Sequence, residues 1–324
     1  MFDTVWFVSG RLLVEARGLT KTYPARNGTP PFRAVDGIDF EFGRGEAFGF
    51  LGPNGAGKSS TMRMLSAVSP ASSGTLRVLG MDPAHDGPAI RARLGVVPQD
   101  DCLDRELTVS ENIYVYGRYF GLKKGVIRER LAGLLAFAQL EEKADAQVEM
   151  LSGGMRRRLT IARSLINEPE IVLLDEPTTG LDPQARHVLW DRLYRLKQDG
   201  VTLIITTHYM DEAEQLCDRI AVMDAGKIVA EGSPRALIEA HVTREVLELR
   251  FPPGTHAEVA ERLRLTELGE RIEALPDRVI AYADDGEAAL ADVHAMSLAP
   301  ITALVRRATL EDVFLKLTGR SLVD

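Results

Sequence analysis

Apolar and polar positions follow distinct patterns along the chain, and these patterns predict the elements of an α/β protein. Short alternating runs between residues 11 and 50 predict antiparallel strands, interrupted by a loop over Pro24–Phe32. Later runs of unbroken apolar or β-branched residues predict strands buried on both faces, as in a parallel sheet. These runs lie at 171–174 and 201–206, and further short strands are predicted at 47–51 and 94–97.

Helical periodicity predicts several helices between these strands. They cover 58–68, 108–120 and 126–140, the last two within a helical insert at about 101–150. A further helix is expected after Asp182, because Asp182 can cap its first turn, Pro183 fits the first helical position and Gly200 follows its end.

The patterns start again after residue 240 and predict a small second domain. Strand-like and helical runs alternate there, at 246–251, 257–265, 272–283, 286–296 and 301–306. We therefore expect an α/β fold with three divisions. They are a ragged N-terminal segment at 1–10, a main domain at 11–240 and a small C-terminal α+β domain at 241–324.

Composition and charge narrow the class of protein. The 324 residues include 39 Lys and Arg and 47 Asp and Glu, and the net charge of −8 argues against a dedicated nucleic-acid binder. The two cysteines, Cys102 and Cys217, form no metal-binding pair and fit a reducing compartment. No apolar stretch approaches the roughly 20 residues of a membrane span, and the start at 1–10 carries Asp3 and lacks the basic residues of a secretion signal. We expect a cytosolic chain, with any membrane span supplied by another protein.

The segment after the strand at 47–51 has the sequence of a phosphate-binding loop. It matches the pattern G-x-x-x-x-G-K-[ST] and consists of Gly52, Pro53, Asn54, Gly55, Ala56, Gly57, Lys58, Ser59 and Ser60. Glycines let backbone N–H groups turn onto phosphate oxygens, while Lys58 adds a positive charge and Ser59 offers a hydroxyl to Mg²⁺. The segment therefore predicts a site for a nucleoside triphosphate with Mg²⁺.

A pair of acidic residues follows another predicted strand. Asp175 and Glu176 come directly after the apolar run at 171–174. Asp175 is expected at the Mg²⁺ ion, and Glu176 where an attacking water must be oriented or deprotonated. Strands often end in a polar turn, so this pair takes its functional meaning from the phosphate loop upstream.

A third segment consists of Leu151, Ser152, Gly153, Gly154 and Met155. It resembles LSGGQ, the signature of the ATP-binding subunits of ABC transporters, from which only Met155 departs. A serine hydroxyl and glycine N–H groups at a helix start form a second anion site. The resemblance implies an ATPase cassette with a parallel-sheet core, an antiparallel β subdomain and a helical subdomain. It also implies binding of ATP and Mg²⁺ and pairing with a second copy, in which each signature meets the γ-phosphate held by the opposite subunit.

Four further residues resemble landmarks of this family. Gln99 is similar to the glutamine that touches Mg²⁺ and contacts the membrane partner, and Asp182 lies in a loop similar to one that crosses the dimer. His208 resembles a catalytic histidine at the γ-phosphate, and Tyr23 resembles the aromatic residue that stacks on adenine. Taken alone, His208 could be a polar residue paired for structure at a strand end, and Tyr23 an exposed strand aromatic.

The arginines at 156–158 and Arg163 allow two interpretations. They could form a nucleic-acid patch, but the acidic balance of the chain favours a solvated helix start that partly faces phosphate. The aromatic residues of 114–120 are expected to be core residues of the helical insert. In the family that this chain resembles, the insert holds the coupling helix of the membrane partner.

Softer matches within the family point to exporters. Segments 101–104, 108–112, 117–121 and 310–320 resemble exporters of lipo-oligosaccharide nodulation factors and their drug-exporting relatives of the daunorubicin-resistance type. We therefore expect an exporter ATPase at the cytoplasmic face of the inner membrane, with a separate permease and no nucleic acid as partner. Alternatives are export of a drug or another glycolipid, an importer, or an ATPase acting on ribosomes or nucleic acid. The last is disfavoured by the single phosphate loop and by the lack of sustained heptads between 60 and 150.

Overall fold

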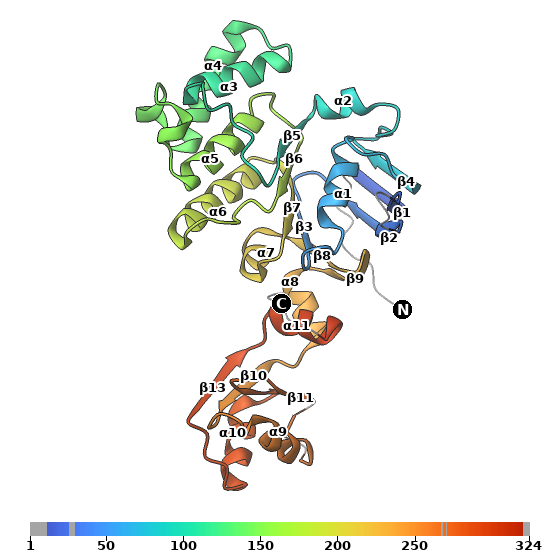
Figure 1. The fold of residues 1–324 in the computed structure, drawn as a ribbon, viewed down its shortest axis with the longest axis vertical. Helices are drawn as coiled ribbons and strands as arrows, with labels where there is room; N and C mark the ends of the chain where they lie inside the picture. Colours follow the sequence, from blue (N-terminus) through green and yellow to red (C-terminus); the bar gives the residue numbers. More distant parts are fainter. Residues whose placement is uncertain (1–11, 26–29, 267, 270, 320–324) are drawn as a thin grey trace. The chain divides into compact units, whose positions relative to one another are not determined.

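The structure is a computed structural model that describes residues 12–25, 30–266, 268–269 and 271–319, so the ragged start expected at 1–10 lies outside the described residues. The chain divides into two compact units, one ending at Glu231 and one beginning at Gly232. Each unit has its own sheets and its own hydrophobic core (Figure 1). Among the described residues, no helix is both long and apolar enough to cross a membrane.

A six-stranded sheet forms the centre of the first unit, in the order β5-β6-β7-β3-β8-β9. The strands are β3 (Ala47–Leu51), β5 (Leu94–Val97), β6 (Ile171–Asp175), β7 (Thr202–Thr207), β8 (Arg219–Asp224) and β9 (Lys227–Gly232). All neighbours from β5 to β8 pair in parallel. Strands β3, β6 and β7 are buried along almost their whole length, which confirms the parallel sheet predicted from the unbroken apolar runs.

A three-stranded antiparallel sheet shares its core with the parallel sheet. Its strands are β2 (Phe32–Phe42), β1 (Val14–Tyr23) and β4 (Ser73–Val78), in that order. Phenylalanine rings from β2 and β3 pack together between the sheets, namely Phe40, Phe42, Phe48 and Phe50. Strand β4 begins at Ser73, where no apolar run in the sequence indicates a strand, and its first three residues are exposed.

Helices surround these sheets (Figure 1). They are α1 (Lys58–Leu65), α2 (Gly87–Arg91), α3 (Val109–Tyr119), α4 (Lys124–Ala138), α5 (Gly153–Ser164), α6 (Pro183–Gln198) and α7 (Met210–Leu216), with single 3-10 turns at Glu141–Lys143 and Val148–Met150. Helices α3, α4 and α5 share a core of their own. One aromatic residue expected in that core, Tyr119, is instead 80% exposed. Helix α6 begins as predicted, because Asp182 Oδ1 accepts a hydrogen bond from Ala185 N at 2.9 Å.

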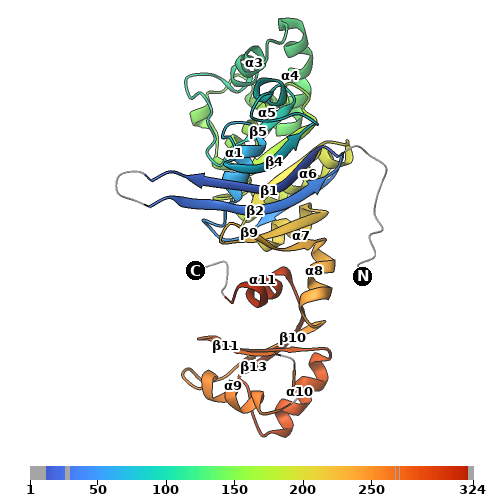
Figure 2. The same ribbon diagram turned by 90° about the vertical axis from the view of Figure 1, so that its right-hand side faces the viewer.

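The second unit is built on a four-stranded antiparallel sheet in the order β11-β12-β10-β13. Its elements follow the ferredoxin-like β-α-β-β-α-β sequence. They are β10 (Glu245–Arg250), α9 (His256–Arg264), β11 (Arg271–Ala274), β12 (Val279–Ala283), α10 (Gly286–Ala295) and β13 (Thr302–Arg307). Helices α9 and α10 cover one face of the sheet, and α8 (Pro234–His241) and α11 (Leu310–Thr318) lie over the other (Figure 2). The single strand predicted at 272–283 is in fact two strands, because Leu275 N donates to Arg278 O at 2.8 Å and closes a turn.

Candidate active site

Predicted site residues follow three neighbouring strands of the parallel sheet. The glycine-rich loop follows β3, Asp175 ends β6, and His208 follows β7. In the sheet, β7 lies between β6 and β3 and is parallel to both. The carboxyl ends of the three strands therefore meet at one edge, which is where open parallel sheets bind ligands.

Two glycines of the phosphate loop have no room for a side chain. A Cβ atom at Gly52 would lie 2.2 Å from Met223 O, and one at Gly57 would lie 2.4 Å from Ala34 O. Gly57 also has a φ of 105°, a left-handed conformation that glycine adopts without strain. Helix α1 begins at the next residue, so the tightly held loop leads directly into a helix N-terminus. This arrangement suits an anion.

Lys58 is buried within this loop. Its Nζ donates hydrogen bonds to Gly52 O at 2.6 Å and Pro53 O at 3.0 Å, and lies 3.7 Å from Glu176 Oε1. Burial lowers the pKa of Lys58, and the carboxylates of Glu176 and Asp175 oppose this shift only in part. The ammonium group therefore lies where an anion with strong acceptor oxygens would stabilise its charge.

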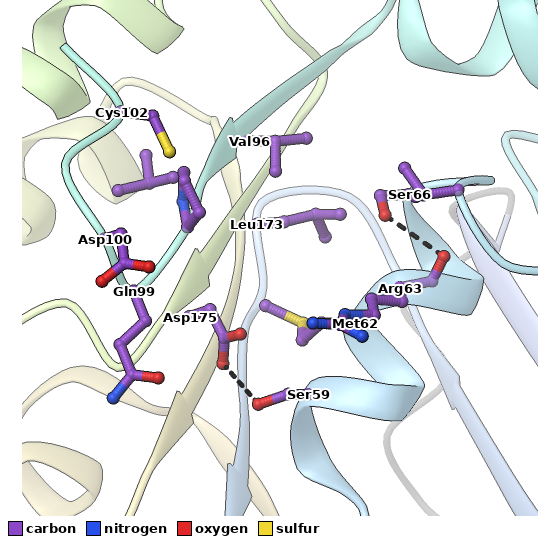
Figure 3. Close-up of a pocket in the computed structure, with 13 residues that line it drawn as sticks. Ser59, Met62, Arg63, Ser66, Val96, Gln99, Asp100, Cys102, Leu173 and Asp175 are labelled. Carbon is purple, nitrogen blue, oxygen red and sulfur yellow. Dashed lines mark hydrogen bonds between the residues drawn. The ribbon is translucent and has the colours of Figure 1, made fainter. Parts of the chain in front are cut away.

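Ser59 and Asp175 bring two oxygen ligands together. Ser59 Oγ donates to Asp175 Oδ1 at 3.3 Å (Figure 3). Thr206 Oγ1 donates to the same oxygen. No cluster of three or more His, Cys, Asp or Glu residues capable of holding a metal occurs in the described part of the chain. Mg²⁺ is commonly held by one or two protein oxygens together with substrate phosphates, so this pair fits Mg²⁺ bound with a nucleotide.

Gln99 lies close to both acidic residues of the site. It lines a cavity of about 300 Å³ together with Ser59 and Asp175 (Figure 3). Its Nε2 donates to Glu176 Oε2 at 3.2 Å. The side chain predicted to touch Mg²⁺ thus bonds to Glu176 and also borders the Ser59–Asp175 pair.

Glu176 is the most constrained acidic residue of the site. Its side chain is buried, and its φ of 45° is unusual for a residue other than glycine. Its backbone N–H donates to Thr206 O at 3.1 Å, and Thr179 Oγ1 donates to its Oε2 at 3.2 Å. Such conformations persist where the surroundings enforce them, and they cluster at functional sites.

His208 faces the same carboxylate from the end of β7. Its Nδ1 lies 3.3 Å from Glu176 Oε1, although the angles do not meet those of a hydrogen bond. Its ring lies against Tyr209, with ring centroids 4.1 Å apart. The alternative of a histidine satisfied by structural hydrogen bonds is therefore not supported for Nδ1.

Tyr23 ends β1, and its hydroxyl lies 3.3 Å from Ser60 Oγ, which places the ring beside the phosphate loop. Phe32 stands directly opposite Tyr23 on β2, is 58% exposed and lines the cavity that contains Lys58 and Glu176. Sequence reasoning missed Phe32. The available signal was an aromatic residue at the start of a strand that pairs with the one ending in Tyr23.

The signature segment lines a different cavity. Ser152, Gly154 and Met155 border it together with Asp182 and Arg158. Ser152 caps α5, because its Oγ accepts a hydrogen bond from Met155 N at 3.3 Å. The structure thus brings the signature and Asp182 together in a cavity of about 300 Å³. No residue of the phosphate loop lines this cavity.

The prediction that the arginines form a solvated helix start is wrong for two of them. Arg157 and Arg163 are only 6% and 8% exposed. Arg163 donates to Cys102 O at 2.9 Å and packs on the ring of Tyr116. Both guanidinium groups satisfy backbone carbonyls inside the unit and face neither solvent nor an open phosphate site.

Two family descriptions match the chain. Residues 35–179 match the family described as ABC transporter, and residues 257–319 match the C-terminal domain of the nodulation factor export protein NodI. The Nod factor export ATP-binding protein I of Ralstonia nicotianae is 48% identical over 96% of this chain and 95% of its own length. The protein of the same description from Cupriavidus metallidurans is 49% identical over 90% of this chain and 94% of its length.

Solved structures of ATP-binding cassettes share the fold. A dimeric cassette bound to ADP and phosphate superposes with a TM-score of 0.62 at 27% identity, covering 68% of this chain and 98% of that one. The cassette CbiO1 of Clostridium perfringens, part of an ABC transporter complex, gives a TM-score of 0.64 at 28% identity, covering 78% of this chain and 95% of that one. These likenesses confirm the predicted cassette fold.

Proposed function

The chain belongs to the ABC transporter family of ATP-binding proteins, and on this premise we propose that two copies of it hydrolyse ATP to drive export through a separate membrane permease. The observation that carries the proposal is the meeting of Lys58, Asp175 and Glu176 at one edge of the parallel sheet. The first supplies a cation for phosphate, the second an oxygen for Mg²⁺, and the third a base. Hydrolysis of a nucleoside triphosphate needs all three.

Phosphate binding is assigned to the loop from Gly52 to Ser60. Lys58 would exchange its carbonyl acceptors for the β- and γ-phosphate oxygens, while the loop N–H groups and α1 hold the remaining oxygens. Ser59, Asp175 and Gln99 are the residues that would hold Mg²⁺, which neutralises phosphate charge when it is bound. The ring of Tyr23 is assigned to the adenine, and stacking needs no particular edge of the base.

Glu176 is assigned as the general base. Its carboxylate would accept the proton of a water molecule that attacks the γ-phosphate, and Gln99 and Thr179 hold that carboxylate by hydrogen bonds. His208, beside the same carboxylate, would donate to a γ-phosphate oxygen. Burial of Glu176 and its two hydrogen bonds keep the carboxylate in place before the substrate arrives.

The second cavity is assigned to the ATP of a second copy. Ser152, Gly154, Met155 and Asp182 line a space at the start of α5, and its lining includes no lysine. A complete site therefore needs the phosphate loop of one copy and the signature of the other.

The relatives support a proposal for the exported compound and for the cellular location of the ATPase. Proteins similar over most of this chain are described as Nod factor export ATP-binding proteins, and residues 257–319 match the corresponding C-terminal domain. We assign a lipo-oligosaccharide of the nodulation-factor class as the exported compound. The ATPase would then work at the cytoplasmic face of the inner membrane, bound to its permease, with no role for nucleic acid.

Replacement of Glu176 by Gln tests the catalytic assignment. Gln keeps the shape of the side chain but cannot accept the proton, so kcat should fall by about 10² or more while ATP binding is kept. Steady-state release of phosphate by the purified full chain measures kcat, and calorimetry measures ATP affinity. Glu142→Gln makes the same change at an exposed residue and should leave both values unchanged. Near-normal turnover by Glu176→Gln would remove Glu176 from this role.

A further inference from the structure

Arg157 has an unusual set of contacts for a buried arginine. It lies in the second turn of α5 and uses all three guanidinium nitrogens on backbone carbonyls. Nε donates to Pro177 O at 2.7 Å, and Nη2 donates to Asp175 O at 2.9 Å. Nη1 donates to Pro98 O and, at 3.2 Å, to Gln99 O. One side chain thus holds two loops that lie far apart in the sequence.

These carbonyls surround the proposed base. Asp175 and Pro177 are the residues on either side of Glu176, and Gln99 carries the amide that donates to Glu176 Oε2. Arg157 therefore fixes the backbone on both sides of the Gln99–Glu176 hydrogen bond. A guanidinium group suits this task, because its planar donors have a fixed geometry.

Arg157 keeps its charge in this position. Burial lowers its pKa to about 10, and the nearby carboxylates of Glu212, Asp175, Asp101 and Glu176 limit the decrease. At neutral pH the group is thus still protonated, and its bonds to the carbonyls are charge-assisted and strong.

The same helix carries the signature. Ser152 caps α5, and five residues at 1.5 Å per residue place Arg157 about 7.5 Å further along the axis. A short helical segment moves as a rigid body, so any shift of the signature also shifts Arg157. The carbonyls that it holds then move with it.

We propose that Arg157 is a positioning residue that links the signature of a chain to the hydrolytic carboxylate of the same chain. When Ser152 and Gly153 engage the ATP held by a second copy, α5 carries Arg157, and Arg157 sets the placement of Gln99 and Glu176. Hydrolysis in one site is thereby tied to occupation of the other. The inference rests on the proposed function, because it assumes that Glu176 is the base.

Arg163 provides a matched control on the same helix. It is equally buried, and burial also lowers its pKa. Its donors reach Cys102 O and Asp101 O, but none of its hydrogen bonds reaches 175–177. Loss of either arginine removes a buried cation that holds backbone carbonyls, yet only Arg157 contacts the backbone around Glu176.

The first experiment compares Arg157→Gln with Arg163→Gln in the purified full chain. Arg157→Gln should lower kcat about tenfold or more, because misplacement of a reacting group by about 1 Å can cost up to 10² in rate. Its ATP affinity should stay within about twofold, since the phosphate loop is untouched. Arg163→Gln should keep kcat within about twofold of the parent once corrected for the folded fraction. Equal losses of kcat in the two variants would overturn the proposal, as would a loss of ATP affinity that matches the loss of kcat.

A double-mutant cycle separates positioning from general damage. If Arg157 acts through Glu176, then Arg157→Gln should add less than about twofold to the loss already caused by Glu176→Gln, measured in single turnovers. A full additional loss in the Glu176→Gln background would contradict the inference. The two proposals fail separately, because a normal rate for Glu176→Gln overturns the proposed base, whereas a normal rate for Arg157→Gln overturns only the linkage.

A conservative variant covers the case in which Arg157→Gln does not fold. Lysine at this position keeps the charge but presents a single nitrogen, which cannot span all four carbonyls. Arg157→Lys should therefore fold and still lose kcat several-fold at unchanged ATP affinity. Full activity of Arg157→Lys would show that charge alone suffices and would overturn the positioning role.

Discussion

Lys58 is a buried cation held by two carbonyls of its own loop. Phosphate oxygens carry charge and accept stronger hydrogen bonds from an ammonium group than neutral carbonyls do. Lys58→Ala should therefore raise the Kd for ATP about tenfold or more, since a hydrogen bond to a charged group contributes about 1.5–3 kcal/mol. Hydrolysis should fall as well. Isothermal titration calorimetry of the purified chain with ATP measures the affinity.

Lys124→Ala is the control for this experiment, because Lys124 is an exposed lysine at the start of α4. Its ATP affinity should match that of the parent chain. An unchanged Kd for a natively folded Lys58→Ala chain would contradict the assignment of the phosphate loop.

Contiguous motifs were sufficient to single out Lys58 and Glu176 as candidates, because each stands next to the glycines or the strand that positions it. They were not sufficient for Arg157, which is one of three consecutive arginines. Which of the three is buried depends on the rotation of α5 against loops near residues 98 and 177. Those loops are distant in sequence, so no local pattern marks the residue that they surround.

Secondary-structure elements with a strong apolar rhythm were predictable, and weaker ones were not. Unbroken apolar runs predicted buried strands such as β6 and β7. The sequence analysis did not predict helices α7 and α11. Helix α7 spans seven residues, too few for a clear period. Helix α11 is the exception, because Leu310, Val313 and Phe314 form a buried apolar face and Thr309 and Asp312 form a capping box at its start, and both signals are local. The ferredoxin-like order of the second unit depends on pairing between distant strands, which periodicity does not specify.

Asp312 supports a prediction about this second unit. Its buried carboxylate accepts hydrogen bonds from Arg306 Nη1 at 2.7 Å, Arg306 Nη2 at 2.9 Å and Thr309 N at 2.8 Å. Removal of one partner leaves a buried charge unpaired, which costs about 3–5 kcal/mol in fully buried pairs. Because Arg306 is partly exposed and still donates to Glu248 Oε1 at 2.6 Å, Asp312→Ala should destabilise the unit by a smaller amount, about 1–3 kcal/mol. Hydrogen exchange measured by mass spectrometry should show lost protection in residues 245–319 and unchanged protection in β3, β6 and β7.

The effect of Asp312→Ala should depend on pH. Burial alone would raise the pKa of Asp312. The hydrogen bonds from Arg306 and Thr309 together outweigh this effect, so the pKa lies below its ordinary value of 3.8. A carboxylate with a lowered pKa stabilises the folded state above the unfolded pKa, and this contribution is lost as the pH falls through the folded pKa. The difference between variant and parent should shrink below about pH 4. The exposed Asp292→Ala serves as control, and an equal effect of both substitutions would contradict the prediction.

The phosphate loop and the signature line different cavities, so under the proposed function one copy does not complete a site alone. Each chain carries a net charge of −8, and two acidic chains repel each other unless something holds them together. Under the proposed function ATP does so, because its phosphates would bind Lys58 of one copy and the signature N–H groups of the other. Hydrolysis would then remove the γ-phosphate that both copies share, and the pair should separate.

A dimer should therefore accumulate only when ATP binds and is not hydrolysed. We expect Glu176→Gln to form a dimer with Mg-ATP and to remain monomeric without nucleotide, as measured by multi-angle light scattering. Adding Ser152→Arg should abolish the dimer, because the bulky side chain fills the anion site at the start of α5. Ser233→Arg is the matched control, because Ser233 caps α8 in the same way as Ser152 caps α5. In both cases the serine Oγ accepts a hydrogen bond from the backbone N–H three residues ahead. In the Glu176→Gln background, this control should leave the dimer intact, which separates loss of the anion site from loss of a helix cap. If the double variant with Ser152→Arg dimerises as well as Glu176→Gln alone, the signature is not the contact between copies. The proposal that each ATP site is completed by the signature of the other copy would then be wrong.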